Sequence, residues 1–133
     1  MHSLLVDAID PRFRTGQRWS YRAREGEETS TLTVLKVESH PGMGVILHVA
    51  VDGLRVSNKL VSGGVTERAC HLPFARTAIE RSVLALTGHE VPADDWRDGY
   101  SQWREAFDEG KAGVFTITVA EAVDALERTF EDA

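Results

Sequence analysis

Two kinds of hydrophobic periodicity divide the chain, and their order along the sequence restricts the fold. Up to about residue 72, apolar residues recur at every second position or in short β-branched runs, which is typical of strands. Beyond that point they recur at spacings of three and four, which is typical of helices. This segregation predicts an α+β fold, with about three helices on one face of a strongly twisted antiparallel sheet.

Two early segments are predicted to be strands because of their alternation and composition. Gln17 to Arg24 places Trp19, Tyr21 and Ala23 on one face and polar side chains on the other, as in a half-buried strand. Thr31 to Glu38 is β-branched and apolar on both parities near its centre, which favours an interior strand.

The pair Asp52-Gly53 is the strongest local turn signal in the chain. It separates two alternating segments, Val45 to Val51 and Leu54 to Leu60. An Asp-Gly pair in this setting predicts a two-residue type I′ hairpin, because both central residues need positive φ. A second turn at Ser62-Gly63-Gly64 then leads into a fifth strand, Val65 to His71.

The remaining elements are predicted to be mainly helical. Pro73 fits the first position of a helix that runs to about Leu86. A second helix, around the aromatic residues from position 96 to 107, ends at Gly110, and Val114 to Ile117 forms a short strand. Thr118 begins a capping box that opens the last helix. The 133 residues are therefore predicted to form one domain, 1–133, with five to six strands.

Composition and charge exclude several classes of protein. The net charge is −6, and the region from residue 90 onward has 12 acidic and only 4 basic residues, which disfavours nucleic-acid binding. No apolar run reaches the length of a membrane span. Cys70 is the only cysteine and is predicted to be a small buried side chain, so no internal disulfide is possible. A single cysteine and the absence of a signal-peptide pattern predict a cytoplasmic protein.

The predicted register suggests one group of polar side chains. If the loop at Gly63-Gly64 has two or four residues, Asn58, Glu67 and His71 share an otherwise apolar face, where they would satisfy one another or line a pocket. A loop of odd length would instead turn the opposite set inward (Thr66, Arg68, Cys70 and Leu72). His71 has a structural alternative, since an imidazole at a strand-to-helix corner can bond to the backbone.

Two side-chain patterns could serve an interface. Trp96, Tyr100 and Trp103 recur on one helix face, which is typical of a core but would also suit a protein interface or a homodimer. Arg18, Arg22 and Arg24 have one parity in their predicted strand. They are predicted to protect a sheet edge and to pair with the acidic helices, and the alternative is a phosphate-bearing ligand or an acidic partner.

Four short stretches together resemble small uncharacterised bacterial proteins without an assigned activity. They are Gly16-Gln17-Arg18-Trp19-Ser20-Tyr21, His71-Leu72-Pro73-Phe74, Tyr100-Ser101-Gln102-Trp103-Arg104 and Ala112-Gly113-Val114-Phe115. The resemblance covers most of the chain. It implies a bacterial, cytoplasmic protein and supplies no mechanism.

The predicted function is a non-catalytic binding module for a protein partner or a small ligand, because no catalytic motif is present. The five histidines have no metal-ligand spacing, so neither a metal nor a cofactor is predicted. One alternative is a hydrolase or lyase in which Glu67 and His71 form an acid/base pair, assisted by Asn58. The other is an immunity-type protein whose acidic helices bind a basic toxin.

Overall fold

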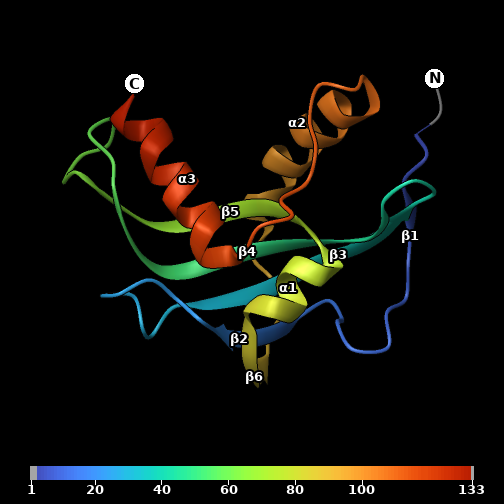
Figure 1. Ribbon diagram of the computed structural model, residues 1–133, viewed down its shortest axis with the longest axis horizontal. Helices are drawn as coiled ribbons and strands as arrows, with labels where there is room; N and C mark the ends of the chain where they lie inside the picture. The colour runs from blue at the N-terminus through green and yellow to red at the C-terminus, as the bar shows by residue number, and fades with distance from the viewer. Residues whose placement is uncertain (1–2, 133) are drawn as a thin grey trace.

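In the described part of the chain, a six-stranded antiparallel sheet forms the centre, and three helices pack against it (Figure 1). The computed structural model describes residues 3–132. Its elements are β1 (Val6–Asp7), β2 (Gln17–Tyr21), β3 (Thr31–His40), β4 (Gly44–Ser57), β5 (Val65–Ala75), α1 (Arg76–Ser82), β6 (Val83–His89), the 3₁₀ turn η1 (Asp94–Trp96), α2 (Arg97–Asp108) and α3 (Val119–Glu131). The strand order is β5-β4-β3-β2-β6, with β1 also paired to β3, which confirms the α+β class and the open antiparallel sheet.

The predicted hairpin at Asp52-Gly53 is wrong, because β4 continues through these two residues. The strand pairs with β3 on one side, where Val49 faces Val34, and with β5 on the other, where Val49 faces Leu72. Gly53 has φ +75° and lies at an irregularity in the pairing with β5. A glycine with positive φ serves a bulge as well as a turn, so the local signal was ambiguous.

The predicted helix from Pro73 to Leu86 is only partly correct. Pro73 belongs to β5, and the helix α1 is confined to Arg76–Ser82. The following residues form β6, which pairs with β2 and supplies its backbone with hydrogen-bond partners. Where Val114–Ile117 was predicted as a strand, the chain makes one parallel bridge, between Phe115 and Phe74.

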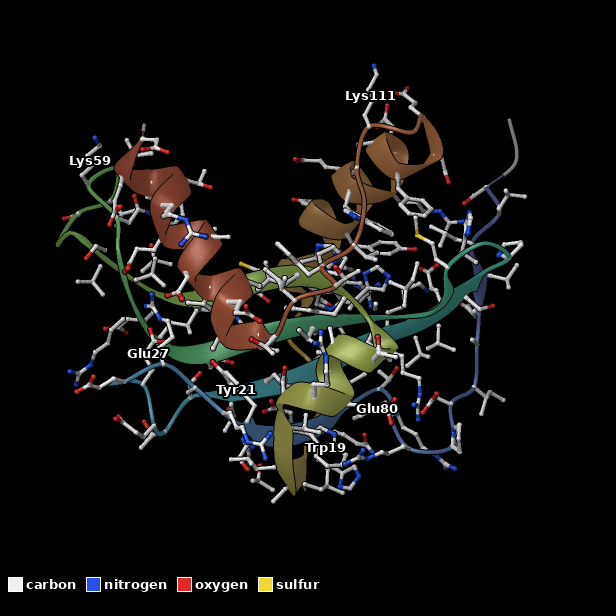
Figure 2. All side chains as sticks on the ribbon, viewed as in Figure 1. Trp19, Tyr21, Glu27, Lys59, Glu80 and Lys111 are labelled. Atoms are coloured by element: carbon white, nitrogen blue, oxygen red, sulfur yellow. The ribbon has the colours of Figure 1, made fainter. Side chains whose placement is uncertain are left out.

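The helices are divided between the two faces of the sheet, whereas the sequence predicted them on one. Alternation along β4 places Val49 in the main core beneath α1 and α3, with Val119 and Val123 of α3. Ala50, on the other face of β4, packs with Trp96 at the start of α2. The central strands are apolar on both faces, so helices must pack on each face to bury these side chains. Trp19 and Tyr21, labelled in Figure 2, belong to the main core, as predicted.

Charged side chains fix α3 to the rest of the fold. The predicted capping box is present, since Thr118 Oγ1 accepts from the Glu121 backbone and Glu121 Oε1 accepts from the Thr118 backbone. The Arg24 guanidinium donates to Glu27, Asp124 and Glu127 at 2.8–3.1 Å. The predicted pairing of arginines with acidic helices is thus confirmed at Arg24. The edge-strand prediction is wrong, because β2 lies between β3 and β6.

Candidate functional site

Three ionisable side chains from three neighbouring strands form a continuous hydrogen-bond chain on the face that α2 covers. Glu38 of β3 lies 2.8 Å (Oε1) from Nε2 of His48 in β4. The other ring nitrogen of His48, Nδ1, lies 2.9 Å from Nε2 of His71 in β5. Glu38 and His48 are both 0% exposed, and His71 is half-buried. We call these three residues the relay.

The strand register explains why these three residues meet. Lys36 faces His48 and Glu38 faces Ile46, so Glu38 and His48 share the side of the sheet opposite the main core. Between β4 and β5, Val49 faces Leu72 and Val51 faces Ala69, so Ala50 alone opposes both Cys70 and His71. This bulge sets the direction of the His71 side chain.

Helix α2 closes the relay from above. The Tyr100 hydroxyl donates to Glu38 Oε2 at 2.8 Å, and Arg104 Nη1 donates to the same oxygen at 3.4 Å and to the Tyr100 oxygen at 2.9 Å. The Trp103 ring lies edge-on to His48, with 4.9 Å between ring centroids. The aromatic stripe of α2 therefore holds a buried ionic network in place. Within the described residues, every buried side-chain nitrogen and oxygen atom has a hydrogen-bond partner.

The surroundings determine the protonation of each member of the relay. Burial alone would raise the pKa of Glu38, but hydrogen bonds from His48 and Tyr100 outweigh it and lower the pKa below its usual value. Burial lowers the pKa of His48, so its ring is neutral at pH 7. Burial and the neighbouring His48 lower the pKa of His71 to about 4. At pH 7 the relay therefore holds one carboxylate and two neutral imidazoles.

These protonation states imply one set of tautomers. An ionised Glu38 only accepts hydrogen bonds, so His48 must carry its proton on Nε2. His48 Nδ1 is then an acceptor, and His71 must carry its own proton on Nε2. His71 Nδ1 keeps a free lone pair. No hydrogen bond joins Nδ1 to any residue in 3–132, and since no buried atom there lacks a partner, Nδ1 is open to solvent.

An open groove of about 310 Å³ runs along β5 between α2 and α3, and His71 lines it. Its lining is mostly apolar but includes the charged residues Arg68 and Asp95. The residues that line it are Thr66, Arg68, Ala69, Cys70, His71, Leu72, Asp95, Gly99, Leu126 and Phe130. Arg68 is bound by Asp95 and Asp52. Gly99 of α2 lies directly over His71, where an added Cβ would be 3.5 Å from the His71 Cβ. The absence of a side chain at Gly99 leaves the groove open above the imidazole.

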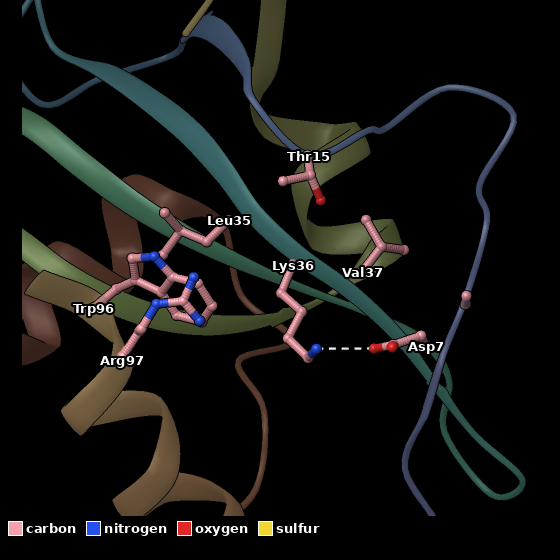
Figure 3. Close-up of a pocket in the computed structure, with 8 residues that line it drawn as sticks. Asp7, Thr15, Leu35, Lys36, Val37, Trp96 and Arg97 are labelled. Carbon is pink, nitrogen blue, oxygen red and sulfur yellow. Dashed lines mark hydrogen bonds and ion pairs between the residues drawn. The ribbon is translucent and has the colours of Figure 1, made fainter. Parts of the chain in front are cut away.

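A second cavity, of about 350 Å³, lies between β1, β3 and the start of α2 (Figure 3). Its cations are already engaged: Lys36 Nζ is 2.8 Å from Asp7 Oδ1, and Arg97 is 3.0 Å from Asp94. The Arg97 guanidinium also lies 4.8 Å from the centroid of the Trp96 ring, on one wall of the cavity. With its charges paired internally, this cavity is a weaker candidate for a ligand than the groove.

The predicted group of Asn58, Glu67 and His71 is not brought together. Asn58 is buried but donates to Thr66 Oγ1 at the start of β5, at 2.9 Å, and not to Glu67 or His71. Glu67 is exposed and forms no hydrogen bond or ion pair with another residue between positions 3 and 132. Only His71 belongs to the site, and it bonds to a side chain rather than to the backbone of the corner. The error follows from the assumed even length of the loop at Gly63-Gly64, since Val56 pairs with Thr66, so that Thr66 and not Glu67 shares its side of the sheet.

The predicted interface of Trp96, Tyr100 and Trp103 lies against the sheet. Trp96 is buried, and the other two side chains are half-buried and bond to Glu38 and to the Gly113 carbonyl. The core alternative is therefore the better description of this stripe.

Sequence reasoning missed Glu38, His48 and Arg104 as members of the site. A signal existed for His48, because it is the one polar residue in the apolar run from Val45 to Val51, whereas Glu38 lies among other polar residues such as Lys36 and Ser39. Cys70 was also predicted wrongly, since its side chain is exposed at the groove.

The part of the chain that the structure describes has neither a metal-binding cluster nor a helix that could span a membrane. Among residues 3–132, no three His, Cys, Asp or Glu side chains are grouped so as to hold a metal ion. None of the helices described has the length and apolar character needed to cross a membrane. No protein-family model, curated protein or solved structure matches the chain, so the geometry alone bears on function.

Proposed function

We propose that the protein is a binding module that holds a small ligand in the groove over β5, with His71 as its polar contact. Three features support this function: a concave surface of about 310 Å³, a mainly apolar lining, and one imidazole nitrogen with a free lone pair. Small-molecule sites typically combine an apolar wall with a few well-placed polar groups. The size of the groove favours a small ligand over the alternative of a protein partner.

The observation that carries the proposal is the fixed orientation of His71. Buried carboxylate and imidazole groups stand behind it and hold its ring through a 2.9 Å hydrogen bond. An exposed histidine without such support would contribute little to ligand binding. An acceptor that is already held in position contributes to both the affinity and the orientation of a ligand.

Acid–base catalysis is the second candidate, because a carboxylate, an imidazole and a second imidazole in series can move protons. The identity of the pair would differ from the sequence prediction: His71 would be the base, with His48 and Glu38 behind it in place of Glu67. A pKa of about 4 makes His71 a weak base at neutral pH. General bases work best with a pKa near the working pH, so binding is the better supported function.

The test is a fragment screen by NMR on the full chain, followed through the methyl signals of Leu72 and Leu126, which line the groove. Small apolar compounds are expected to shift these signals in a saturable way. Gly99→Phe is expected to abolish the shifts by filling the groove. Gly99→Ala is the matched control, because its Cβ makes only an ordinary contact with His71 and should leave binding intact. The proposal fails if no compound perturbs these signals, or if both variants bind equally well.

A further inference from the structure

We infer that the groove selects ligands that donate a hydrogen bond and rejects ligands that only accept one, and that Glu38, which does not line the groove, sets this selection through the tautomers of His48 and His71. The inference rests on the proposed ligand-binding function and adds the chemical class of the ligand: an apolar body that bears one N–H or O–H donor.

The first step is that the Glu38 carboxylate only accepts hydrogen bonds. Its Oε2 accepts from Tyr100 and Arg104, and its Oε1 faces His48. Both oxygens are therefore aimed at donors, and a carboxylate has no proton of its own to give. His48 is fully buried, so leaving its Nε2 without a proton would set two acceptors against each other at 2.8 Å.

The second step carries this polarity to the groove. A neutral imidazole has one donor and one acceptor nitrogen. Once the hydrogen-bond partner of one ring nitrogen determines whether that nitrogen carries the proton, the protonation of the other nitrogen follows. With the proton of His48 on Nε2, its Nδ1 accepts from His71 Nε2, and His71 Nδ1, the ring nitrogen without a protein partner among the described residues, is left as the acceptor that a ligand in the groove can reach. The groove thus presents a lone pair, with a carboxylate two rings behind it. An acceptor-only ligand would meet this lone pair without a proton between them.

The third step identifies a substitution that reverses the polarity. In Glu38→Gln, the amide oxygen is expected to take the Oε2 position, because Tyr100 and Arg104 both donate there. The amide nitrogen then faces His48 Nε2 and donates to it. His48 must move its proton to Nδ1, and His71 must move its own proton from Nε2 to Nδ1. The groove of the variant would then present a donor in place of an acceptor.

The experiment has two independent readouts. The first is ¹⁵N NMR of the histidine side chains in the free full-length protein, which distinguishes protonated from unprotonated ring nitrogens. In the wild type we expect Nε2 of both His48 and His71 to carry the proton, and in Glu38→Gln we expect both protons on Nδ1. The second is the affinity for three bicyclic probes of similar shape: indole, which only donates, 1-indanone, which only accepts, and indene, which does neither.

The wild type is expected to bind indole about two- to tenfold more tightly than indene, and 1-indanone no more tightly than indene, since one net hydrogen bond is at stake. Glu38→Gln is expected to reverse the order of indole and 1-indanone. A merely structural role for Glu38 would weaken all three probes together, which would refute the inference. A wild-type His71 protonated on Nδ1 would also refute it, even if the groove binds ligands. Failure of all three probes to bind would overturn the proposed function and the inference with it.

Discussion

The His71 imidazole should make the protein less stable as the pH falls from 7 to 5. In the folded state the pKa of His71 is about 4, below its usual value of 6.5, because the ring is buried and lies next to His48. The unfolded chain therefore takes up the proton first as the pH falls. The contribution of His71 to stability is fully present above about pH 6.5 and is lost progressively as the pH falls towards about 4.

The size of the stability loss follows from the lowering of the His71 pKa. For a fully shielded group, one pKa unit corresponds to about 1.4 kcal/mol, and the part of the shift expressed between pH 7 and pH 5 would be about 2 kcal/mol. His71 is only half-buried and opens to the groove, so solvent screening reduces this to about 1 kcal/mol. The lowered pKa of the fully buried His48 acts in the same direction.

Urea denaturation at pH 7, 6 and 5 measures this loss. His71→Gln keeps a donor toward His48 and removes the titrating ring, so its free energy of unfolding should change less over this range than that of the wild type. His89→Gln is the matched control, because His89 is exposed at the end of β6 and lies outside the relay. If His71→Gln and His89→Gln lose the same stability between pH 7 and pH 5, the electrostatic description of the relay is wrong. A wild type that becomes more stable at pH 5 would refute it as well.

Three further substitutions test the fold around the site. Gly53→Ala should destabilise the protein by about 1–3 kcal/mol in urea denaturation, because φ is +75° and the new Cβ would lie 3.0 Å from the Ser30 Cα. Tyr100→Phe should cost about 1–3 kcal/mol in the same assay, because Glu38 loses a hydrogen bond of 2.8 Å in a buried site. Thr118→Ala should cost about 1 kcal/mol through loss of the cap of α3, seen as a lower midpoint in thermal unfolding followed by circular dichroism.

Matched controls separate these effects from general damage. Gly113→Ala should change stability little, because nothing lies within 4 Å of its Cβ position and its φ is not positive. Thr129→Ala removes an exposed hydroxyl within α3 without affecting the cap, so it should not lower the midpoint. Equal losses at Gly113 and Gly53, or at Thr129 and Thr118, would contradict the assigned causes. An unchanged stability of Tyr100→Phe would mean that its hydroxyl does not support Glu38.

Elements whose signal lies within a few residues were predicted correctly. The alternation around Trp19, the capping box at Thr118 and the helical stripe of aromatic residues each reflect a contact between near neighbours in sequence. The same locality explains the errors. Gly53 adopts the positive φ that the sequence demands, yet only the pairing of β4 with β3 and β5 determines that this φ serves a bulge. The sequence from Val83 to His89 is equally consistent with a helix, and it forms a strand only because it pairs with the otherwise unpaired edge of β2.

The sequence by itself determined the class of fold, because hydrophobic periodicity and caps depend on local geometry that any context must respect. It also supplied His71 as a candidate. Only the tertiary structure decided which groups surround that imidazole, since Glu38, His48 and Tyr100 lie between 23 and 33 residues from it along the chain. Sheet register and the side of the sheet that α2 covers bring them within hydrogen-bond distance, and both depend on the burial of the whole domain rather than on any segment of it.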